Sequence, residues 1–272
     1  MTLSPKDQIR TMTATASDKP TQEWDVERYR DQHSFVWEYG TSLVDILQPQ
    51  PGERILDVGC GSGELTAAIA NTASRIKAVG FDADPDMVAQ AKKQYPDLSF
   101  FQGDGRNFEV EEPYDAIFSN AALHWIPRED AKRAIVAMSK ALKIGGRFVV
   151  EFGGKGNVQS ILEAGHDVIP GFESPWYFPS IAEYCCLLEQ HGIEVTSAAL
   201  FDRPTPLDNG AEGMGNWIRC FGKAFFKGVR EEQVEGLIGQ MEEKLRHRLY
   251  DKDASLWTAD YRRIRIIGKR IF

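Results

Sequence analysis

A short strand, a glycine-rich loop and a helix follow one another at residues 54–71, and this arrangement constrains the fold more than any other part of the chain. The apolar run Arg54–Val58 is followed by the alternating glycines Gly59, Gly61 and Gly63, and a helix is predicted over 64–71. Glycine permits positive φ angles and lets a ligand approach the backbone closely. Because the N–H groups at the start of a helix favour anionic groups, we expect a nucleotide-type ligand where this strand meets this helix.

The residues of this loop exclude two common nucleotide sites. A dinucleotide-binding loop, GxGxxG counted from Gly59, needs glycine or alanine at position 64, where this chain has Glu64. That glutamate would face a pyrophosphate. A P-loop ends in Gly-Lys followed by Ser or Thr, and this loop lacks that ending. The sequence therefore favours a nucleotide-type ligand without a pyrophosphate.

Strands and helices alternate around this loop. Strands are predicted over 54–58, 76–81, 98–102, 116–119 and 147–152, and helices over 64–71, 86–94 and 130–142, the last closed by Gly145 and Gly146. Repeated strand–helix–strand units with continuous apolar strands indicate an α/β protein whose parallel sheet is covered on both faces. A helix over 180–191 and strands over 193–200 and 257–271 are also predicted.

The domain organisation follows from shifts in composition. Residues 1–20 are rich in Ser and Thr and poor in large apolar groups, which is typical of a disordered tail. Residues 21–272 are predicted to form one domain. Within it, 153–179 (rich in Gly, Pro and aromatic residues) and 204–250 (apolar residues at three- and four-residue steps) are predicted to be loop and helical insertions that form a cap.

Acidic residues accompany the first three predicted strands. Asp57 lies in the first strand, Asp82 ends the second and Asp104 follows the third. Open α/β sheets bind ligands at the carboxyl ends of their strands, and a carboxylate at the end of the second strand can accept two hydrogen bonds from a ribose diol. Met87, on the next helix, is placed to pack on an adenine ring.

Three segments carry a resemblance to a known family. The acid followed by G-x-G-x-G resembles motif I of class I S-adenosylmethionine-dependent methyltransferases. Residues 115–125, DAIFSNAALHW, resemble the fourth-strand segment of the trans-aconitate methyltransferase-like group, whose members methylate carboxylates. Residues 24–29, WDVERY, resemble its N-terminal stretch, so that the resemblance covers about residues 24–152.

The resemblance implies a fold. It is a Rossmann-like, seven-stranded, mostly parallel sheet with strand order 3-2-1-4-5-7-6 and an antiparallel strand 7, carrying a helical cap. Strand 6 would lie at 193–200 and strand 7 at 260–267. Because strand 7 runs backwards, its start would lie near the substrate.

The resemblance also implies the cofactor, S-adenosylmethionine, with S-adenosylhomocysteine as product. In the family the glycine loop passes under the methionine part, the acid of motif I helps to hold the ammonium region, and an acid after the third strand accepts from the adenine amino group. The N-terminal helix covers the cofactor. The cofactor-binding residues expected on this basis are Asp57, Gly59, Cys60, Gly61, Gly63, Asp82, Ala83, Met87, Gly103, Asp104, Gly105, Asn120, Tyr29 and His33.

His124 is the candidate catalytic residue, because it directly follows the fourth strand. Its possible roles are a general base, a donor to a substrate oxygen, or a packing residue. A carboxylate substrate would favour an arginine fork, for which Arg219, Arg262 and Arg263 are candidates. The residues predicted to contact the substrate are Trp125, Trp217, Tyr261 and Arg263.

Composition limits the partners. The formal charge is −8, from 40 acidic and 32 basic residues, so no overall field attracts nucleic acid or an anionic membrane. The longest apolar runs fall short of the about 18 residues of a spanning helix. The four cysteines lack zinc-ligand spacing, and we expect no metal site. The N-terminus lacks the apolar core of a signal peptide. A cytoplasmic monomer or homodimer without membrane or nucleic-acid partners is predicted.

The sequence thus predicts methyl transfer to a small-molecule acceptor, with a carboxylate oxygen as the favoured atom. Two alternatives remain open at this point. One is methylation of a nitrogen, a carbon or a hydroxyl oxygen of a natural product. The other is a module that binds S-adenosylmethionine or S-adenosylhomocysteine without catalysis.

Overall fold

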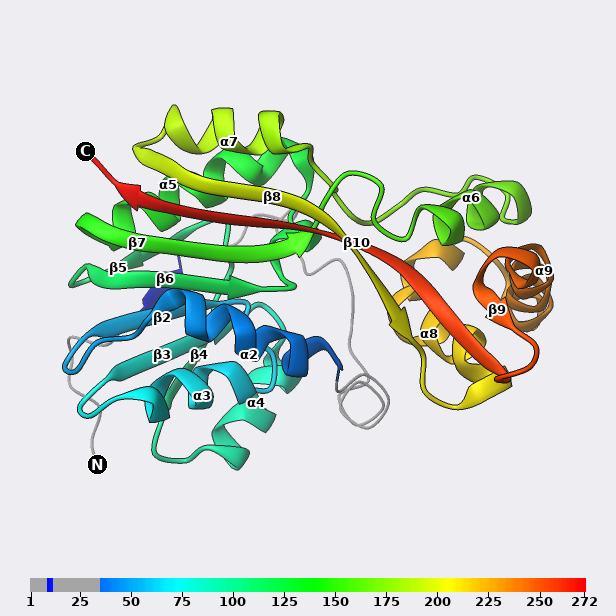
Figure 1. Cartoon of the computed structure of the whole chain (residues 1–272), viewed down its shortest axis with the longest axis horizontal. Coiled ribbons are helices and arrows are strands. Elements are labelled where there is room, and N and C mark those ends of the chain that lie inside the picture. The colour runs from blue at the N-terminus through cyan, green and yellow to red at the C-terminus, as the bar shows by residue number, and fades with distance from the viewer. Residues whose placement is uncertain (1–8, 12–34) are drawn as a thin grey trace.

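The computed structural model describes residues 9–11 and 35–272 and consists of a large sheet lobe and a smaller helical cap (Figure 1). The two longest strands, β8 (Ile193–Pro206) and β10 (Leu256–Arg270), run from the sheet into the cap. Because these strands belong to both parts, they fix the cap at one end of the sheet.

The sheet has the order β4-β3-β2-β6-β7-β10-β8. Its other members are β2 (Arg54–Val58), β3 (Lys77–Asp82), β4 (Ser99–Gln102), β6 (Tyr114–Asn120) and β7 (Leu142–Gly153). The five strands from β4 to β7 pair in parallel, and β10 pairs antiparallel with both β7 and β8. Numbered along the chain, this is the order 3-2-1-4-5-7-6 with an antiparallel strand 7, so the predicted fold is confirmed.

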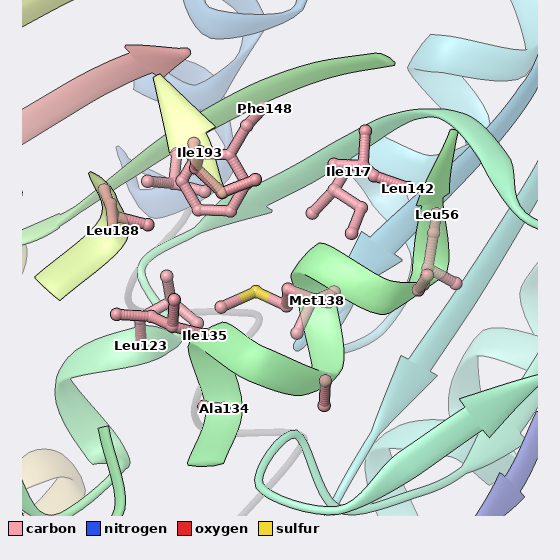
Figure 2. Close-up of a cluster of buried hydrophobic side chains, with 14 of the residues drawn as sticks. Leu56, Ile117, Leu123, Ala134, Ile135, Met138, Leu142, Phe148, Leu188 and Ile193 are labelled. Carbon is pink, nitrogen blue, oxygen red and sulfur yellow. The ribbon is translucent and has the colours of Figure 1, made fainter. Parts of the chain in front are cut away.

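Helices cover both faces because the strands are apolar on both sides. On one face, α5 (Ala131–Ala141) and α7 (Ile181–Glu189) lie over the sheet. Figure 2 shows Met138 and Ile135 of α5 pointing at side chains of the strands, including Ile117 and Phe148. On the other face lie α2 (Phe35–Leu47) and α3 (Glu64–Thr72). The helix α4 (Pro85–Gln94) packs beside β4.

The cap has a hydrophobic core of its own. It contains α6 (Gln159–Val168), α8 (Gly213–Phe221) and α9 (Glu231–Leu249), and the short β9 (Tyr250–Asp251) pairs with the start of β10. Trp217, Met241 and Trp257 are almost completely buried in this core. The single turns of 3₁₀ helix in the described chain are η3 (Leu123–Trp125), η4 (Arg128–Asp130), η5 (Gly210–Glu212) and η6 (Lys223–Phe226).

Several elements differ from the sequence prediction. The strand predicted over 193–200 continues to Pro206, so residues 204–206 are extended rather than helical. β8 is an edge strand, and proline is tolerated there. The insertion at 153–179 contains the helix α6. Gly145 and Gly146 lie inside β7, because α5 ends at Ala141.

Three residues of the predicted disordered tail form a strand. β1 (Ile9–Thr11) pairs antiparallel with β5 (Phe108–Val110). Disorder is therefore the wrong expectation for residues 9–11, while the rest of 1–20 lies outside the described residues. Within the part of the chain that the structure describes, no helix is both long and apolar enough to cross a membrane.

Candidate active site

A cavity opens at the carboxyl ends of the parallel strands and extends under the cap. We call its two parts the sheet-side half and the cap-side half. Predicted residues that line the sheet-side half are Gly59, Gly61, Asp82, Ala83, Met87, Gly103, Asp104, Gly105 and Asn120. Predicted residues that line the cap-side half are His124, Trp125, Trp217, Tyr261 and Arg263.

The glycine loop turns tightly to present Gly61 to the cavity. The N–H groups of Gly59 and Cys60 both donate to the Phe81 carbonyl oxygen, at 2.9 and 3.0 Å. Gly59 has a φ of +73°, and a Cβ at this position would lie 2.2 Å from the Cβ of Ala122. Gly61 has a φ of +53° and open space beside it. Only glycine therefore allows this path, which leaves room for a ligand against the backbone.

The carboxylate of Asp82 is placed where it could accept hydrogen bonds from a ribose diol. One of its carboxylate oxygens accepts from the Gly61 N–H at 2.9 Å, and the other accepts from the Asp84 N–H at 3.0 Å. Each oxygen can accept a further hydrogen bond, and the residue lines the cavity. Burial raises the pKa of this carboxyl group. Donors from a ligand would therefore stabilise its charged form.

Asp57, Cys60 and Gly63 do not line the cavity. Asp57 lies beneath the loop, where the Thr66 hydroxyl donates to it at 2.6 Å, and burial raises its pKa to about 7. Gly63 directly precedes α3 and has a φ of +91°, and a Cβ there would meet the Phe100 ring. These three residues shape the loop from the side of the protein interior.

Asp104 is held by an arginine that the sequence analysis did not single out. The Arg106 Nε lies 2.9 Å from both carboxylate oxygens of Asp104, and its Nη1 lies 3.3 Å from Asp130. Asp104 thus has a fixed orientation at the cavity wall. The sequence could have indicated this contact, because Arg106 follows Asp104 by only two residues.

His124 has a defined tautomer. Its Nδ1 accepts the backbone N–H of Gly153 at 3.3 Å, so the proton of the neutral ring resides on Nε2. Burial, together with the positive charge of Arg263, lowers the pKa of His124 well below its ordinary value. The residue therefore offers a hydrogen-bond donor at Nε2 rather than a base.

Three arginines converge on one buried glutamate, and we call this group the arginine cluster. Glu151 is 1% exposed and lies opposite Arg265 in the pairing of β7 with β10. Arg265 Nη2 lies 2.7 Å, Arg203 Nη1 2.5 Å and Arg263 Nε 3.7 Å from its carboxylate oxygens. The cluster carries a net charge of +2, since three guanidinium groups share one carboxylate.

Alternation along the strands explains which arginines reach the cavity. Arg263 lines it together with Tyr261, two residues earlier on the same face of β10. Arg262 points to the other face, with Nε 3.2 Å from Asp202, and Arg219 pairs with Glu235 at 2.6 Å. Arg203, on β8 opposite Tyr261, also lines the cavity and was not predicted. Phe201, Arg203 and Thr205 are two residues apart, and this spacing could have placed Arg203 on one face of a longer strand.

Aromatic rings make up much of the remaining wall of the cap-side half. The Trp176 ring lies 5.4 Å from that of Trp125, 5.8 Å from Phe178 and 6.1 Å from Trp217, measured between centroids. The Trp217 Nε1–H donates to the Tyr261 hydroxyl at 2.7 Å. These contacts bring Trp125, Trp217 and Tyr261 together as one wall.

Two predicted cofactor-binding residues and the prediction about metals remain. Tyr29 and His33 lie outside the described residues. No group of three or more His, Cys, Asp or Glu side chains within residues 9–11 and 35–272 has the arrangement of a metal site.

Comparisons with known proteins show what the chain is similar to. A methyltransferase domain family matches residues 55–146. An uncharacterised methyltransferase of Schizosaccharomyces pombe is 28% identical, over 92% of this chain and 99% of its own length. Trans-aconitate 2-methyltransferase of Escherichia coli is 36% identical over 96 residues, which are 34% of this chain and 38% of that enzyme.

A solved structure shares the fold. Phosphoethanolamine N-methyltransferase 2 of Haemonchus contortus, in complex with phosphomonomethylethanolamine and S-adenosylhomocysteine, has a TM-score of 0.55 at 15% identity. The match covers 90% of this chain and 57% of that one. The enzyme described here uses S-adenosylmethionine, and the open glycine loop and Asp82 fit that cofactor. The chain is an S-adenosylmethionine-dependent methyltransferase, and over 96 residues it is similar to trans-aconitate 2-methyltransferase.

Proposed function

We propose that this enzyme methylates a carboxylate oxygen of a small molecule and so forms a methyl ester. The observation that carries the proposal is the arginine cluster. Arg203 and Arg263 line the cap-side half, and both lie beside the buried carboxylate of Glu151. Guanidinium groups bind carboxylates through short, charge-assisted hydrogen bonds. A carboxylate acceptor would therefore meet guanidinium groups on the wall of this half of the cavity.

The state of His124 supports the same acceptor. A phenol, an amine or a carbon acid usually needs a base to remove its proton. His124 has its proton on Nε2 and a lowered pKa, so it lacks the free lone pair on the side away from Gly153. A carboxylate is already ionised at neutral pH. His124 would donate from Nε2 to the carboxylate oxygen that is not methylated.

The sheet-side half would hold the cofactor. We assign the ribose to Asp82, the adenine to Met87 and Asp104, and the methionine part to the loop around Gly61, with Ala83, Gly103, Gly105 and Asn120 completing the wall. When bound, S-adenosylmethionine supplies an electrophilic methyl group whose bond to sulfur breaks, with the electron pair remaining on sulfur, as the bond to the acceptor forms. The residues of the cap-side half would then contribute to catalysis by orienting the acceptor oxygen.

The proposal is tested with the full chain and methyl-labelled S-adenosylmethionine, offered a panel of carboxylic acids, phenols and amines. We expect label only in acids, and we expect the label to leave as methanol at high pH. Label that is stable to base would place the methyl group on nitrogen, carbon or an ether oxygen and would overturn the proposal.

Two neighbouring arginines provide a matched pair of variants. Arg263→Gln removes a charge-assisted contact worth about 1.5–3 kcal/mol, so KM for the acid should rise by about 10- to 100-fold. Arg262→Gln changes a half-buried arginine on the opposite face of β10, and KM should stay within about twofold. S-adenosylhomocysteine binding, measured by calorimetry, should be equal in both variants. Equal KM values for the acid would count against the role of the arginine cluster.

A further inference from the structure

Asn157 lines the cavity, although the sequence analysis did not single it out. The residue lies between β7 and α6 and is 3% exposed. Its Oδ1 accepts the backbone N–H of Arg262, on β10, at 2.8 Å. Because a backbone N–H can only donate, this contact fixes which end of the amide is oxygen. The other end of the side chain is therefore the donor Nδ2.

The Nδ2 group of Asn157 has no hydrogen-bond acceptor among the described residues. It is also not fully enclosed by protein atoms, so it keeps surface that a ligand can reach. Because the side chain lines the cavity and is otherwise buried, this surface faces the cavity. Buried amide donors normally have a partner. An oxygen atom of a bound molecule would supply one.

The backbone beside Asn157 is held in a strained conformation. Val158 has a φ of +45°, which is rare for a β-branched residue. The Asn157 N–H donates to the Gly154 carbonyl oxygen at 2.9 Å, and the Val158 N–H donates to that of Asp260 at 3.0 Å. Residues strained in this way cluster at functional sites, where the surrounding contacts maintain the strain. These contacts fix the position of Asn157 at the cavity wall.

His124 provides a second donor close to Gly153. A Cβ on Gly153 would collide with the Phe178 ring and would lie 2.9 Å from the Asn157 Nδ2, so glycine leaves the room that Asn157 needs. The Gly153 N–H donates to the Nδ1 of His124, and the Nε2–H of His124 has no acceptor within the described part of the chain. The cavity wall near Gly153 therefore carries two neutral N–H donors.

The carboxylates of the cavity lie elsewhere. Among the described residues, those that line it are Asp82, Asp84 and Asp104, in the sheet-side half. An oxygen atom beside Asn157 would accept a hydrogen bond, whereas an ammonium group there would face another donor and lose its hydration without compensation. The hydrogen-bonding groups near Asn157 thus favour an acceptor molecule with oxygen at this point.

We propose that Asn157 is a substrate-binding residue that donates from Nδ2 to an oxygen of the methyl acceptor, and that this donor makes the enzyme prefer a carboxylate to an amine on the same carbon skeleton. The inference rests on the proposed function and adds a residue that determines specificity. The methyl transfer itself is unchanged, because the acceptor oxygen forms the bond to carbon and Asn157 keeps its protons.

Two pairs of probes test this preference, cinnamic acid with cinnamylamine and octanoic acid with octylamine. The pair whose acid gains more base-labile label in wild type is used. Its Kd values are measured by calorimetry with the full chain loaded with S-adenosylhomocysteine, at a pH of about 7.5, where the acid is ionised and the amine protonated. We expect the wild type to bind the acid at least about tenfold more tightly than the amine.

Asn157→Asp is the informative variant. It keeps an oxygen for the Arg262 N–H and replaces the donor with a charged acceptor, so the preference for the acid should fall by at least about tenfold. Asn216→Asp is the matched control, because it makes the same change in the cap at a residue that does not line the cavity. Its preference should stay within about twofold of wild type, and S-adenosylhomocysteine should bind equally to both variants.

The outcomes separate the inference from the proposed function. If no acid in either pair or in the wider panel gives base-labile label, the proposed function fails and the inference fails with it. If esters form and Asn157→Asp keeps the preference of wild type, the inference alone fails. An equal weakening of acid and amine in Asn157→Asp would indicate a purely structural role for this side chain and would also overturn the inference.

Discussion

At the scale of single residues, the site depends on where backbone groups place each ionisable side chain. The Gly61 and Asp84 N–H groups fix Asp82 at the cavity, whereas Thr66 turns Asp57 toward the interior. The glycines and Asp82 were predictable, because their roles are local to one strand–loop–helix unit. The position of Asp57 was not, because it depends on the Thr66 hydroxyl, nine residues further along in the first turn of α3.

Asp82 gives the first prediction at this scale. Asp82→Ala removes the proposed acceptor of two ribose hydrogen bonds, each worth about 0.5–1.5 kcal/mol, so the Kd for S-adenosylhomocysteine should rise by at least about fivefold. Calorimetry measures this directly. Asp86→Ala, at an exposed site in the first turn of α4, is the control and should leave the Kd unchanged. An unchanged Kd in Asp82→Ala would contradict the assignment of the ribose.

His124 gives a prediction about pH and stability. Its pKa is lowered in the folded protein, so below the ordinary pKa of about 6.5 the unfolded chain binds one more proton than the folded one. The folded state then loses stability as pH falls, by up to about 1.4 kcal/mol per pH unit for one proton. Between pH 6.5 and 5.0, the free energy of unfolding of the wild type should therefore fall more steeply than that of His124→Gln. Urea denaturation at several pH values measures both slopes. Parallel slopes would show that His124 protonates without cost in the folded protein.

At the scale of elements, the short central strands were easier to predict than the two long ones. β2 was predicted with the bounds that it has, because its residues are apolar and a glycine follows at once. β8 was predicted to end at residue 200, since Pro204 and Pro206 argue against a strand. Pairing with β10 overrides that preference. An edge strand forms backbone hydrogen bonds with a neighbour on one side only, so a proline whose nitrogen faces the other side breaks none of them. The missed part of β8 carries Arg203, so one error in an element's end removed a site residue.

The same scale explains why the arginine cluster could not be read from the sequence. Glu151, Arg203 and Arg265 come from three strands, and their meeting depends on the register of β10 against β7 and β8. Pairings between strands far apart in sequence leave no local pattern. The arginine cluster therefore forms only when β10 pairs with β7 and β8 in this register.

At the scale of the whole molecule, the two halves of the cavity depend on different hydrophobic cores. Met241 of α9 is completely buried in the core of the cap, and Met138 of α5 is completely buried in the core of the sheet lobe. The sheet-side half draws its walls from the sheet lobe, whereas the aromatic wall includes cap residues such as Trp217. We therefore expect damage to the cap to affect the acceptor more than the cofactor.

Two methionine-to-alanine variants test this separation. Each deletes a buried side chain and should cost about 2–5 kcal/mol of folding stability. In Met241→Ala, hydrogen exchange should speed up in α6, α8 and α9 before it does so in the strands β2, β3 and β6. Its Kd for S-adenosylhomocysteine should stay within about twofold of wild type, while its KM for the acid rises. Met138→Ala is the counterpart, and it should speed exchange in the sheet and weaken cofactor binding as well. Equal effects of Met241→Ala on cofactor and acid would mean that the cap and the sheet open as one cooperative unit. The two long strands β8 and β10 would then transmit the damage, because they are the elements that both lobes share.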